Sequence, residues 1–210
     1  MNGVLTVVLA PTCAACDRVL ETPLDGPVCA ACWSGIVRLH QPLTEASRAA
    51  GEYEGSLREI IHAFKYDGRQ SLAGPLARLM HEAGADLLRD ADFVVPVPLH
   101  PWRRLQRGFN QAEELARRLD MPVRSALWRV RATVPQTELD IAQRRRNVRG
   151  AFRLSPFVRR SRLEGARIVL IDDVRTTGAT LDACARVLRD AGAREIQVLT
   201  VAQARVTRSR

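Results

Sequence analysis

The chain has 210 residues, of which 46% are hydrophobic and 26% are charged, a composition that supports a folded domain with a small appendage and excludes global disorder. No apolar run approaches the roughly eighteen residues that a transmembrane helix needs. The net charge is +9, but residues 101–210 carry 24 basic and 11 acidic side chains, so this half favours an anionic ligand such as a polyphosphate or a nucleic acid.

The start of the chain combines a short apolar stretch with a cysteine cluster. Residues 4–10 are apolar, but no basic residue precedes them, so we expect no signal peptide and a cytoplasmic protein. Two C-x-x-C knuckles follow, formed by Cys13, Cys16, Cys29 and Cys32. Each knuckle can turn back so that both sulfurs reach one ion, and four thiolates complete a tetrahedral zinc site.

The competing interpretations of the knuckles are two disulfides or a dithiol redox motif. Without a secretory signal a disulfide scaffold is disfavoured, and a redox C-x-x-C normally occurs once, within a larger strand and helix unit. A segment of about thirty residues cannot form an adequate core, so a metal would have to supply its folding energy. We therefore expect a structural zinc ion in a zinc-ribbon-like module over residues 1–40.

The remaining chain alternates predicted helices and strands. A polar stretch with a proline predicts a linker over 41–54, ahead of a main domain over 55–210. Apolar spacing predicts helices over 55–66, 72–88, 111–119 and 181–190, and strands over 93–97, 126–130, 151–154, 167–171 and 196–201. This alternation predicts an α/β fold with a mainly parallel sheet and helices on both faces. A ligand is then expected at the carboxyl ends of the strands.

The first expected strand of the main domain leads into a basic loop. Pro96 and Pro98 hold the strand exit extended, and Gly108 permits close approach of a ligand to the backbone. Arg103, Arg104 and Arg107 can meet negative charge, so the loop is suited to pyrophosphate. Taken alone, the segment is equally well explained by a strand end followed by solvated arginines.

A second strand, loop and helix pattern lies near the end of the chain. The apolar run 169–171 ends in Asp172 and Asp173, and residues 174–180 lead into an amphipathic helix. The backbone N–H groups of such a loop, together with the hydroxyl and backbone groups of Thr176, Thr177, Gly178, Ala179 and Thr180, favour a phosphate at the helix N-terminus.

The two carboxylates refine this prediction. They repel phosphate but accept hydrogen bonds from vicinal hydroxyls about a sugar's length away, so a ribose 5-phosphate fits both halves of the motif. The segment lacks the Gly-Lys-Ser/Thr ending of a Walker A loop and the spaced glycines of a dinucleotide fingerprint. The alternative interpretation is a solvated strand end followed by an ordinary polar turn.

Residues 169–180 resemble the phosphoribosyl pyrophosphate (PRPP) loop of the type I phosphoribosyltransferases, although the usual motif has an aliphatic residue where this chain has Arg175. Together with residues 107–111, Gln136 and residues 144–151, they resemble the ComF/GntX branch of that family, in which a four-cysteine zinc knuckle also precedes the domain. The resemblance implies a type I phosphoribosyltransferase-like sheet. It also implies Mg²⁺-dependent displacement of pyrophosphate from PRPP by a nitrogenous acceptor.

The resemblance also implies residue roles. Asp172 and Asp173 would hold the ribose hydroxyls beside the developing positive charge, residues 176–180 would hold the 5-phosphate, and Arg103, Arg107, Gly108 and Asn110 would hold the pyrophosphate. Related transferases close a lid over the pyrophosphate, and here Arg144, Arg145, Arg146 and Arg149 are the candidates. A solvated basic loop or a nucleic-acid contact explains these four arginines as well.

Two functions from different classes follow. The first is a phosphoribosyltransferase, a glycosyltransferase of the pentosyl class that binds PRPP and Mg²⁺. The second is a non-catalytic competence protein, an accessory in DNA uptake or DNA processing that binds single-stranded DNA or DNA-processing proteins. Cys184 has the helical spacing of a buried residue rather than a nucleophile, and the four histidines have no spacing that suggests a metal site or a triad.

Overall fold

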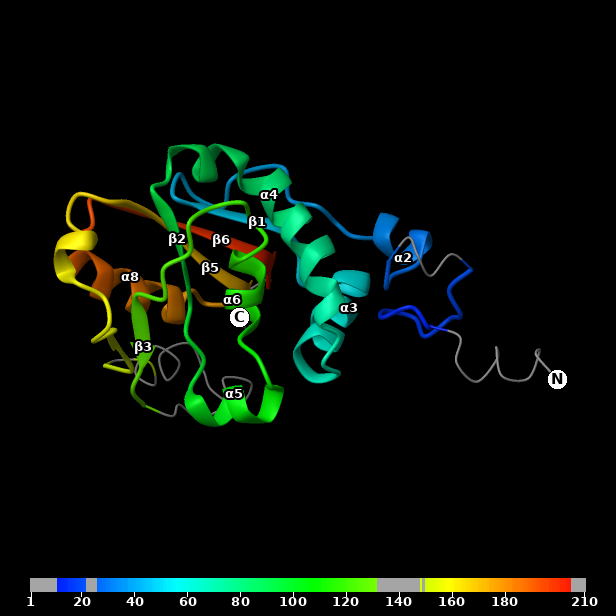
Figure 1. Ribbon diagram of the computed structural model, residues 1–210. Helices are drawn as coiled ribbons and strands as arrows, with labels where there is room; N and C mark the ends of the chain where they lie inside the picture. Colours follow the sequence, from blue (N-terminus) through cyan, green and yellow to red (C-terminus); the bar gives the residue numbers. More distant parts are fainter. Residues whose placement is uncertain (1–10, 22–25, 132–147, 149, 205–210) are drawn as a thin grey trace, which may run out of the picture.

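The computed structural model describes residues 11–21, 26–131, 148 and 150–204. Figure 1 shows a twisted sheet with helices packed against it, and a small N-terminal segment beside α3 at one end of the molecule. The helices are α2 (Ala30–Ser34), α3 (Gly55–Tyr66), α4 (Ala73–Asp90), α5 (Pro101–Arg107), α6 (Gln111–Ala116) and α8 (Ala179–Asp190). The strands are β1 (Ser47–Glu52), β2 (Phe93–Pro96), β3 (Leu127–Arg129), β4 (Phe152–Leu154), β5 (Arg167–Arg175) and β6 (Glu195–Gln203).

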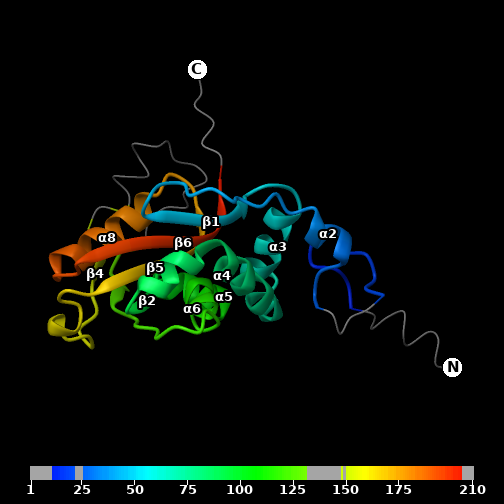
Figure 2. The ribbon, with the colours of Figure 1, turned by 90° about the horizontal axis from the view of Figure 1, so that it is seen from above.

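Four parallel strands form the main sheet in the order β1-β6-β5-β2, as Figure 2 shows for β1, β6 and β5. The register places Val95 opposite Leu170 and Val169 opposite Gln197. Because all four strands run the same way, the carboxyl ends of β2 and β5 meet at one edge of the sheet. The predicted α/β fold with a parallel sheet is confirmed.

The sheet is buried on both faces, because its apolar residues alternate between two separate cores. Val94, Val169 and Ile171 point into one core, which α3, α4 and α6 cover. Phe93, Val95, Ile168 and Leu170 point into the other, which α8 covers. The period of two along each strand therefore explains why its apolar residues are continuous rather than alternating with polar ones. Helices on both faces are confirmed.

The linker expected over 41–54 is wrong for residues 47–52, which form the edge strand β1. Its sequence lacks the β-branched and aromatic residues that predict a strand, and pairing with β6 decides its conformation instead. Close packing explains the small residues: a Cβ at Gly51 would lie 2.7 Å from Leu57 Cδ2 and 2.9 Å from the Val37 carbonyl oxygen. The sheet therefore extends into the segment that we expected to connect two modules.

Two other segments differ from expectation. The strands predicted over 126–130 and 151–154 form, but as β3 and β4 they pair with each other in a separate antiparallel ribbon. The loop predicted after β2 contains α5, which His100 caps and Pro101 begins. Proline at the first helical position needs no hydrogen bond from its nitrogen, so it starts this helix rather than preventing it.

The cysteine-containing segment packs against the main core through Ala14, Val28 and Trp33. The Arg69 guanidinium also donates a hydrogen bond to the Thr12 carbonyl oxygen over 2.9 Å. The division into a module over 1–40 and a domain over 55–210 stays a prediction. None of the helices in the described part of the chain combines the length and the apolar character that a membrane span requires.

Candidate functional site

A cavity of about 200 Å³ opens at the carboxyl ends of β2 and β5. Its lining brings together predicted site residues from the loops that follow these two strands, namely Arg103, Arg107, Asn110, Asp172, Asp173, Thr176 and Thr180. Gly108, Thr177, Gly178 and Ala179 belong to the same two segments but are not among the described residues that line the cavity. The lid candidates Arg144, Arg145, Arg146 and Arg149 lie outside the described residues.

A buried ion pair lies at the floor of the cavity. Lys65 Nζ, from the last turn of α3, is 2.7 Å from Asp173 Oδ1, and the two side chains are only 14% and 13% exposed. The Asp173 backbone N–H donates to Asp172 Oδ1 over 2.9 Å. Lys65 is the only lysine in a chain with 32 basic residues, so the one flexible ammonium is placed against the carboxyl pair.

The electrostatics of this group keep one carboxyl close to protonation at neutral pH. Burial and then the Asp173 charge raise the pKa of Asp172 to about 7, although Lys65 and the Asp173 N–H act in the opposite direction. Burial alone lowers the pKa of Lys65, but the charge and hydrogen bond of Asp173 together with the Asp172 charge outweigh it, and the net shift is upward. The lysine therefore stays charged, and Asp172 is ready to ionise when a ligand supplies hydroxyl donors or positive charge.

The loop after β5 leaves unused donors at the start of α8. The backbone N–H groups of Thr176, Thr177 and Gly178 donate no hydrogen bond to any described residue. Gly178 has φ +77°, the left-handed conformation that favours glycine, and it precedes the twelve-residue helix α8. Free N–H groups and the positive end of the helix dipole together form a site suited to an anion.

Arg175 lies beneath this loop. Its Nη1 donates to Ser47 Oγ over 2.8 Å, and its Nε would be 3.3 Å from a Cβ at Gly178. Its backbone carbonyl accepts from the Ala204 N–H over 2.8 Å. The side chain thus ties the loop to the edge strand β1, which explains how an arginine is accommodated where the family motif has an aliphatic residue.

The predicted pyrophosphate residues come from α5 and the start of α6. Arg107 donates to Tyr66 Oη over 3.1 Å and to Gln111 Oε1 over 3.2 Å, and its guanidinium lies 4.8 Å from the Tyr66 ring centroid. Asn110 Oδ1 accepts from the Ala112 N–H, and its Nδ2 donates to the Val97 carbonyl oxygen, each over 3.1 Å. Arg107 thus faces the cavity, while Asn110 mainly fixes the entry to α6.

Our sequence prediction of the site omitted Lys65, Tyr66, Gln111 and Arg129, all of which line the cavity. Arg129 is 6% exposed and lies 5.3 Å from the Phe152 ring centroid, and burial and then Arg103 lower its pKa. The sequence contained one indication of this position. In the expected strand, Arg129 alternates with Trp128, which is exposed, and so shares the inner face with Leu127. Gln111 is 1% exposed, and its Nε2 has no hydrogen-bond partner among the described residues.

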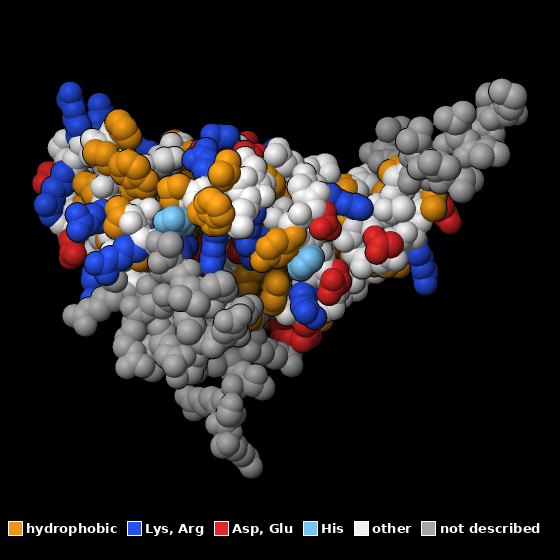
Figure 3. Space-filling model, turned by 90° about the horizontal axis from the view of Figure 1, so that it is seen from below, with side chains coloured by type: hydrophobic (Ala, Val, Ile, Leu, Met, Phe, Trp, Pro, Cys, Tyr) orange, Lys and Arg blue, Asp and Glu red, His pale blue; other side chains and the backbone are white. Residues whose placement is uncertain are grey.

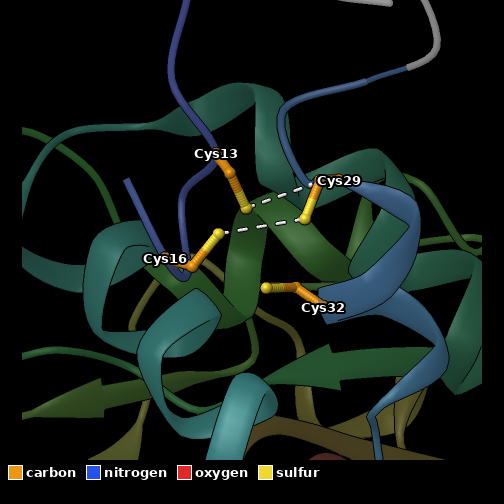
Figure 4. A group of neighbouring side chains, drawn as sticks. All are labelled: Cys13, Cys16, Cys29 and Cys32. Atoms are coloured by element: carbon orange, nitrogen blue, oxygen red, sulfur yellow. Dashed lines mark hydrogen bonds between the residues drawn. The ribbon is translucent and has the colours of Figure 1, made fainter. Parts of the chain in front are cut away.

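The four N-terminal cysteines converge, as Figure 4 shows. Their sulfur atoms all lie within 4.8 Å of one another, with Cys13 and Cys16 from one turn and Cys29 and Cys32 from the start of α2. Four sulfurs around one Zn²⁺ at about 2.3 Å would be separated by about 3.8 Å, so little rearrangement is needed. Cys184 is buried in the core that α8 covers, and burial raises its pKa well above the ordinary value.

Backbone donors already surround the cluster. The N–H groups of Cys29 and Ala15 donate to Cys13 Sγ over 3.3 and 3.4 Å. Burial raises the pKa of Cys13, but these donors together with Cys16 outweigh it and lower the pKa to about 6, whereas burial and the neighbouring cysteines raise the pKa of Cys32 to about 12. A cation shared by the four sulfurs would replace their protons and offset the repulsion between thiolates, and the donor set fits zinc.

Comparison with known proteins agrees with this geometry. Residues 104–210 match the phosphoribosyl transferase domain family. The chain is 31% identical over 222 residues to Competence protein F of Haemophilus influenzae, covering 97% of this chain and 95% of that protein. It is 31% identical over 205 residues to the DNA utilization protein YhgH of Escherichia coli K12, covering 89% and 87%.

Among solved structures, orotate phosphoribosyltransferase from Aeropyrum pernix is similar over 81% of this chain and 88% of its own, with 18% identity and a TM-score of 0.39. The resemblance of the sequence motifs to one family is therefore confirmed by the domain match and by relatives that cover nearly the whole chain. The chain belongs to the phosphoribosyl transferase domain family, in the ComF-type branch whose domain follows a four-cysteine cluster.

Proposed function

We propose that the cavity binds PRPP and that the protein transfers the phosphoribosyl group to a nitrogenous acceptor, with release of pyrophosphate. One observation carries this proposal: two carboxyl groups, Asp172 and Asp173, precede a loop at the start of α8 in which three backbone N–H groups donate to none of the described residues. That spacing suits a ribose whose 5-phosphate and hydroxyls are bound by adjacent parts of one segment. The family match supports the donor but does not identify the acceptor.

The binding roles follow from where the charges lie. The loop over 176–180 takes the 5-phosphate, and Asp172 and Asp173 accept hydrogen bonds from the ribose hydroxyls. Arg103 and Arg107, on the α5 side of the same cavity, take the pyrophosphate. Mg²⁺ enters as the metal complex of PRPP, so it belongs to the substrate and neutralises part of the phosphate charge.

The transfer needs no protein nucleophile. The bond from the anomeric carbon to pyrophosphate breaks with its electron pair leaving on pyrophosphate, a bond to the acceptor nitrogen forms, and the acceptor loses a proton. Positive charge develops on the ribose near Asp172 and Asp173, and negative charge develops near the arginines of α5. Both stabilisations are strongest in the transition state, which is where they increase the rate.

The cysteine cluster carries a separate, structural proposal. The four thiolates hold one Zn²⁺, and the ion replaces the hydrophobic core that a segment of this size lacks. The Ala14 N–H donates to the Pro27 carbonyl oxygen over 2.9 Å, so the two knuckles are also joined by backbone. The zinc therefore fixes the N-terminal segment against α3 and the main core.

A second candidate function is an accessory role in DNA uptake or processing, with binding of single-stranded DNA. The names of the two relatives, Competence protein F and DNA utilization protein, favour it, as does the excess of 24 basic over 11 acidic residues in the second half of the chain. Phosphate-rich strands are attracted to such a field. PRPP binding and nucleic-acid binding are compatible, because recognition of the donor does not require turnover.

Removal of both carboxylates tests the PRPP proposal. We expect PRPP with Mg²⁺ to bind the wild type in titration calorimetry, and Asp172→Asn with Asp173→Asn to bind at least about 100-fold more weakly, because two hydrogen bonds to charged groups are lost. Asp190→Asn, at the exposed end of α8, is the control and leaves binding unchanged. No binding by the wild type, or equal binding by the double variant, overturns the proposal.

The raised pKa of Asp172 predicts a pH dependence. Ionisation of Asp172 costs stability in the free protein as pH rises towards 7, and the ribose hydroxyls offset that cost by donating to the carboxylate. PRPP affinity therefore rises by about tenfold between pH 6 and pH 8 in the wild type, beyond the change due to PRPP's own phosphates. Asp172→Asn shows only the latter change, and identical pH profiles for both proteins contradict the assignment.

Elemental analysis tests the zinc proposal. The purified protein contains one zinc per chain, and Cys32→Ser loses most of it because a tetrahedral site then lacks one thiolate. A chelator lowers the thermal midpoint of the wild type. Cys184→Ala, which removes the cysteine outside the cluster, keeps its zinc. A wild type without zinc, or an unchanged zinc content in Cys32→Ser, rules the structural ion out.

Salt dependence tests the DNA proposal. A fluorescein-labelled oligothymidylate should bind the wild type in an anisotropy titration, with an affinity that falls steeply as salt rises. The logarithmic slope should be about −0.7 for each phosphate that a guanidinium neutralises on a single strand. Absence of binding, or affinity that does not change with salt, counts against an electrostatic nucleic-acid site.

A further inference from the structure

Two aromatic side chains are exposed on the β3–β4 ribbon and the turn that follows it. Trp128 on β3 is 47% exposed and Phe157 is 89% exposed, with ring centroids 6.4 Å apart and planes inclined by 36°. Ser155 holds the turn, since its carbonyl oxygen accepts from the Val158 N–H over 3.1 Å. Large aromatic residues are usually buried, so a neighbouring exposed pair marks a binding surface.

Arginines lie around this aromatic pair, and the two segments that carry the pair contain no acidic residue. Arg153 is the cross-strand partner of Trp128, and both are exposed. A hollow of about 390 Å³ is lined by Arg124, Phe157, Val158, Arg159 and Arg162. Segments 121–131 and 150–163 contain seven arginines and no Asp or Glu. We call the surface formed by Trp128, Arg153, Phe157, Arg159 and Arg160 the aromatic–arginine surface.

The arginines of this surface differ from those beside α6 in their ion pairing. Among the described residues, Arg153, Arg159 and Arg160 make no ion pair, whereas Arg117 and Arg118, just after α6, are paired with Glu113 and Glu114 at 2.6 and 2.7 Å. Figure 3 shows basic side chains gathered around hydrophobic ones at the end of the molecule away from the N-terminal segment. The arginines there are available for an external anion.

We propose that the aromatic–arginine surface binds single-stranded nucleic acid. Unpaired bases stack on exposed aromatic rings, and guanidinium groups contact the phosphates between them. A duplex hides its base faces, so it would use the arginines but not the rings. An acidic protein segment would likewise gain charge contacts without a need for two adjacent aromatic faces. The inference rests on the second proposed function and assigns it a place.

The aromatic–arginine surface is outside the proposed PRPP cavity, although β3 contributes a residue to each. Trp128 points outward from β3, whereas its neighbour Arg129 is buried and lines the cavity. Successive side chains of a strand point to opposite faces, so Trp128 and Arg129 face different sides although they are adjacent in the chain. Loss of the ring at Trp128 should therefore affect nucleic-acid binding without removing a PRPP contact.

Paired variants test the surface with a fluorescein-labelled oligothymidylate of roughly 16 nucleotides, the upper end of the usual site size for one such module. Trp128→Ala with Phe157→Ala should weaken binding about tenfold or more, because each lost stacking contact is worth a factor of this order. Trp102→Ala, which removes a 63% exposed tryptophan from α5, should not. A duplex of the same length should bind the wild type more weakly and be insensitive to the aromatic substitutions.

The charge arm compares arginines that make no ion pair among the described residues with arginines that are paired. Arg153→Gln with Arg159→Gln and Arg160→Gln should reduce the salt slope by about 2, from about 0.7 per lost phosphate contact. Arg117→Gln with Arg118→Gln removes two charges that are already paired and should change the slope little. Thermal midpoints close to that of the wild type confirm that the exposed substitutions leave the fold intact.

The outcomes separate the two proposals. If the wild type does not bind the oligonucleotide, the second proposed function fails, and the surface assignment fails with it. If the wild type binds but both sets of variants match their controls, only the assignment is overturned. Equal affinity for the duplex, or equal displacement of the oligonucleotide by polyglutamate and by unlabelled oligothymidylate, shows a general polyanion surface and also overturns it.

Discussion

The ion pair between Lys65 and Asp173 is the constraint on which the site depends. Two adjacent carboxyl groups at the end of β5 repel each other, and partial burial makes that repulsion costly. Lys65 offsets it from α3, with its Nζ 2.7 Å from Asp173 Oδ1. The position of α3 over the sheet edge is thus an electrostatic requirement of the site as well as a packing arrangement. Breaking the pair would leave one charge buried without compensation.

The edge strand β1 has a comparable role for the loop over 176–180, the proposed phosphate site. Ser47 accepts a hydrogen bond from Arg175, which lies under Gly178, so the loop rests on a side chain anchored in the sheet. The backbone of Arg175 is also held, because the Ala204 N–H donates to its carbonyl oxygen. Within this loop, the Ala179 N–H donates to Thr177 Oγ1 over a long 3.5 Å, so internal bonds do little to define its shape. Support from below supplies that definition, which is the preorganisation an anion site needs.

The local parts of the site could be predicted from the sequence, and the distant parts could not. Strand, loop and helix over 167–190 follow from an apolar run, Gly178 and helical spacing, all within one segment. Helix α5 escaped prediction because its arginines and prolines also suit a loop, although Pro101 is placed as a first helical residue. Lys65 reaches the cavity only through the packing of α3, and no spacing within 55–66 identifies its partner. β1 likewise depends on β6 for its strand conformation.

The arginines in the second half of the chain differ in the groups that surround them, so their shared positive charge does not indicate one function. Just after α6, Arg117 and Arg118 are paired with Glu113 and Glu114 of that helix and contribute little to the binding of a distant anion. Arg103 and Arg107 face a cavity that also contains two carboxyl groups, an arrangement that suits a small ligand with both phosphate and hydroxyl groups, as proposed above. On the β3–β4 ribbon, Arg153 stands beside an exposed tryptophan without an acidic neighbour in sequence. The same residue type therefore serves three environments, and the groups around each guanidinium, rather than the net charge, decide which anion it can bind.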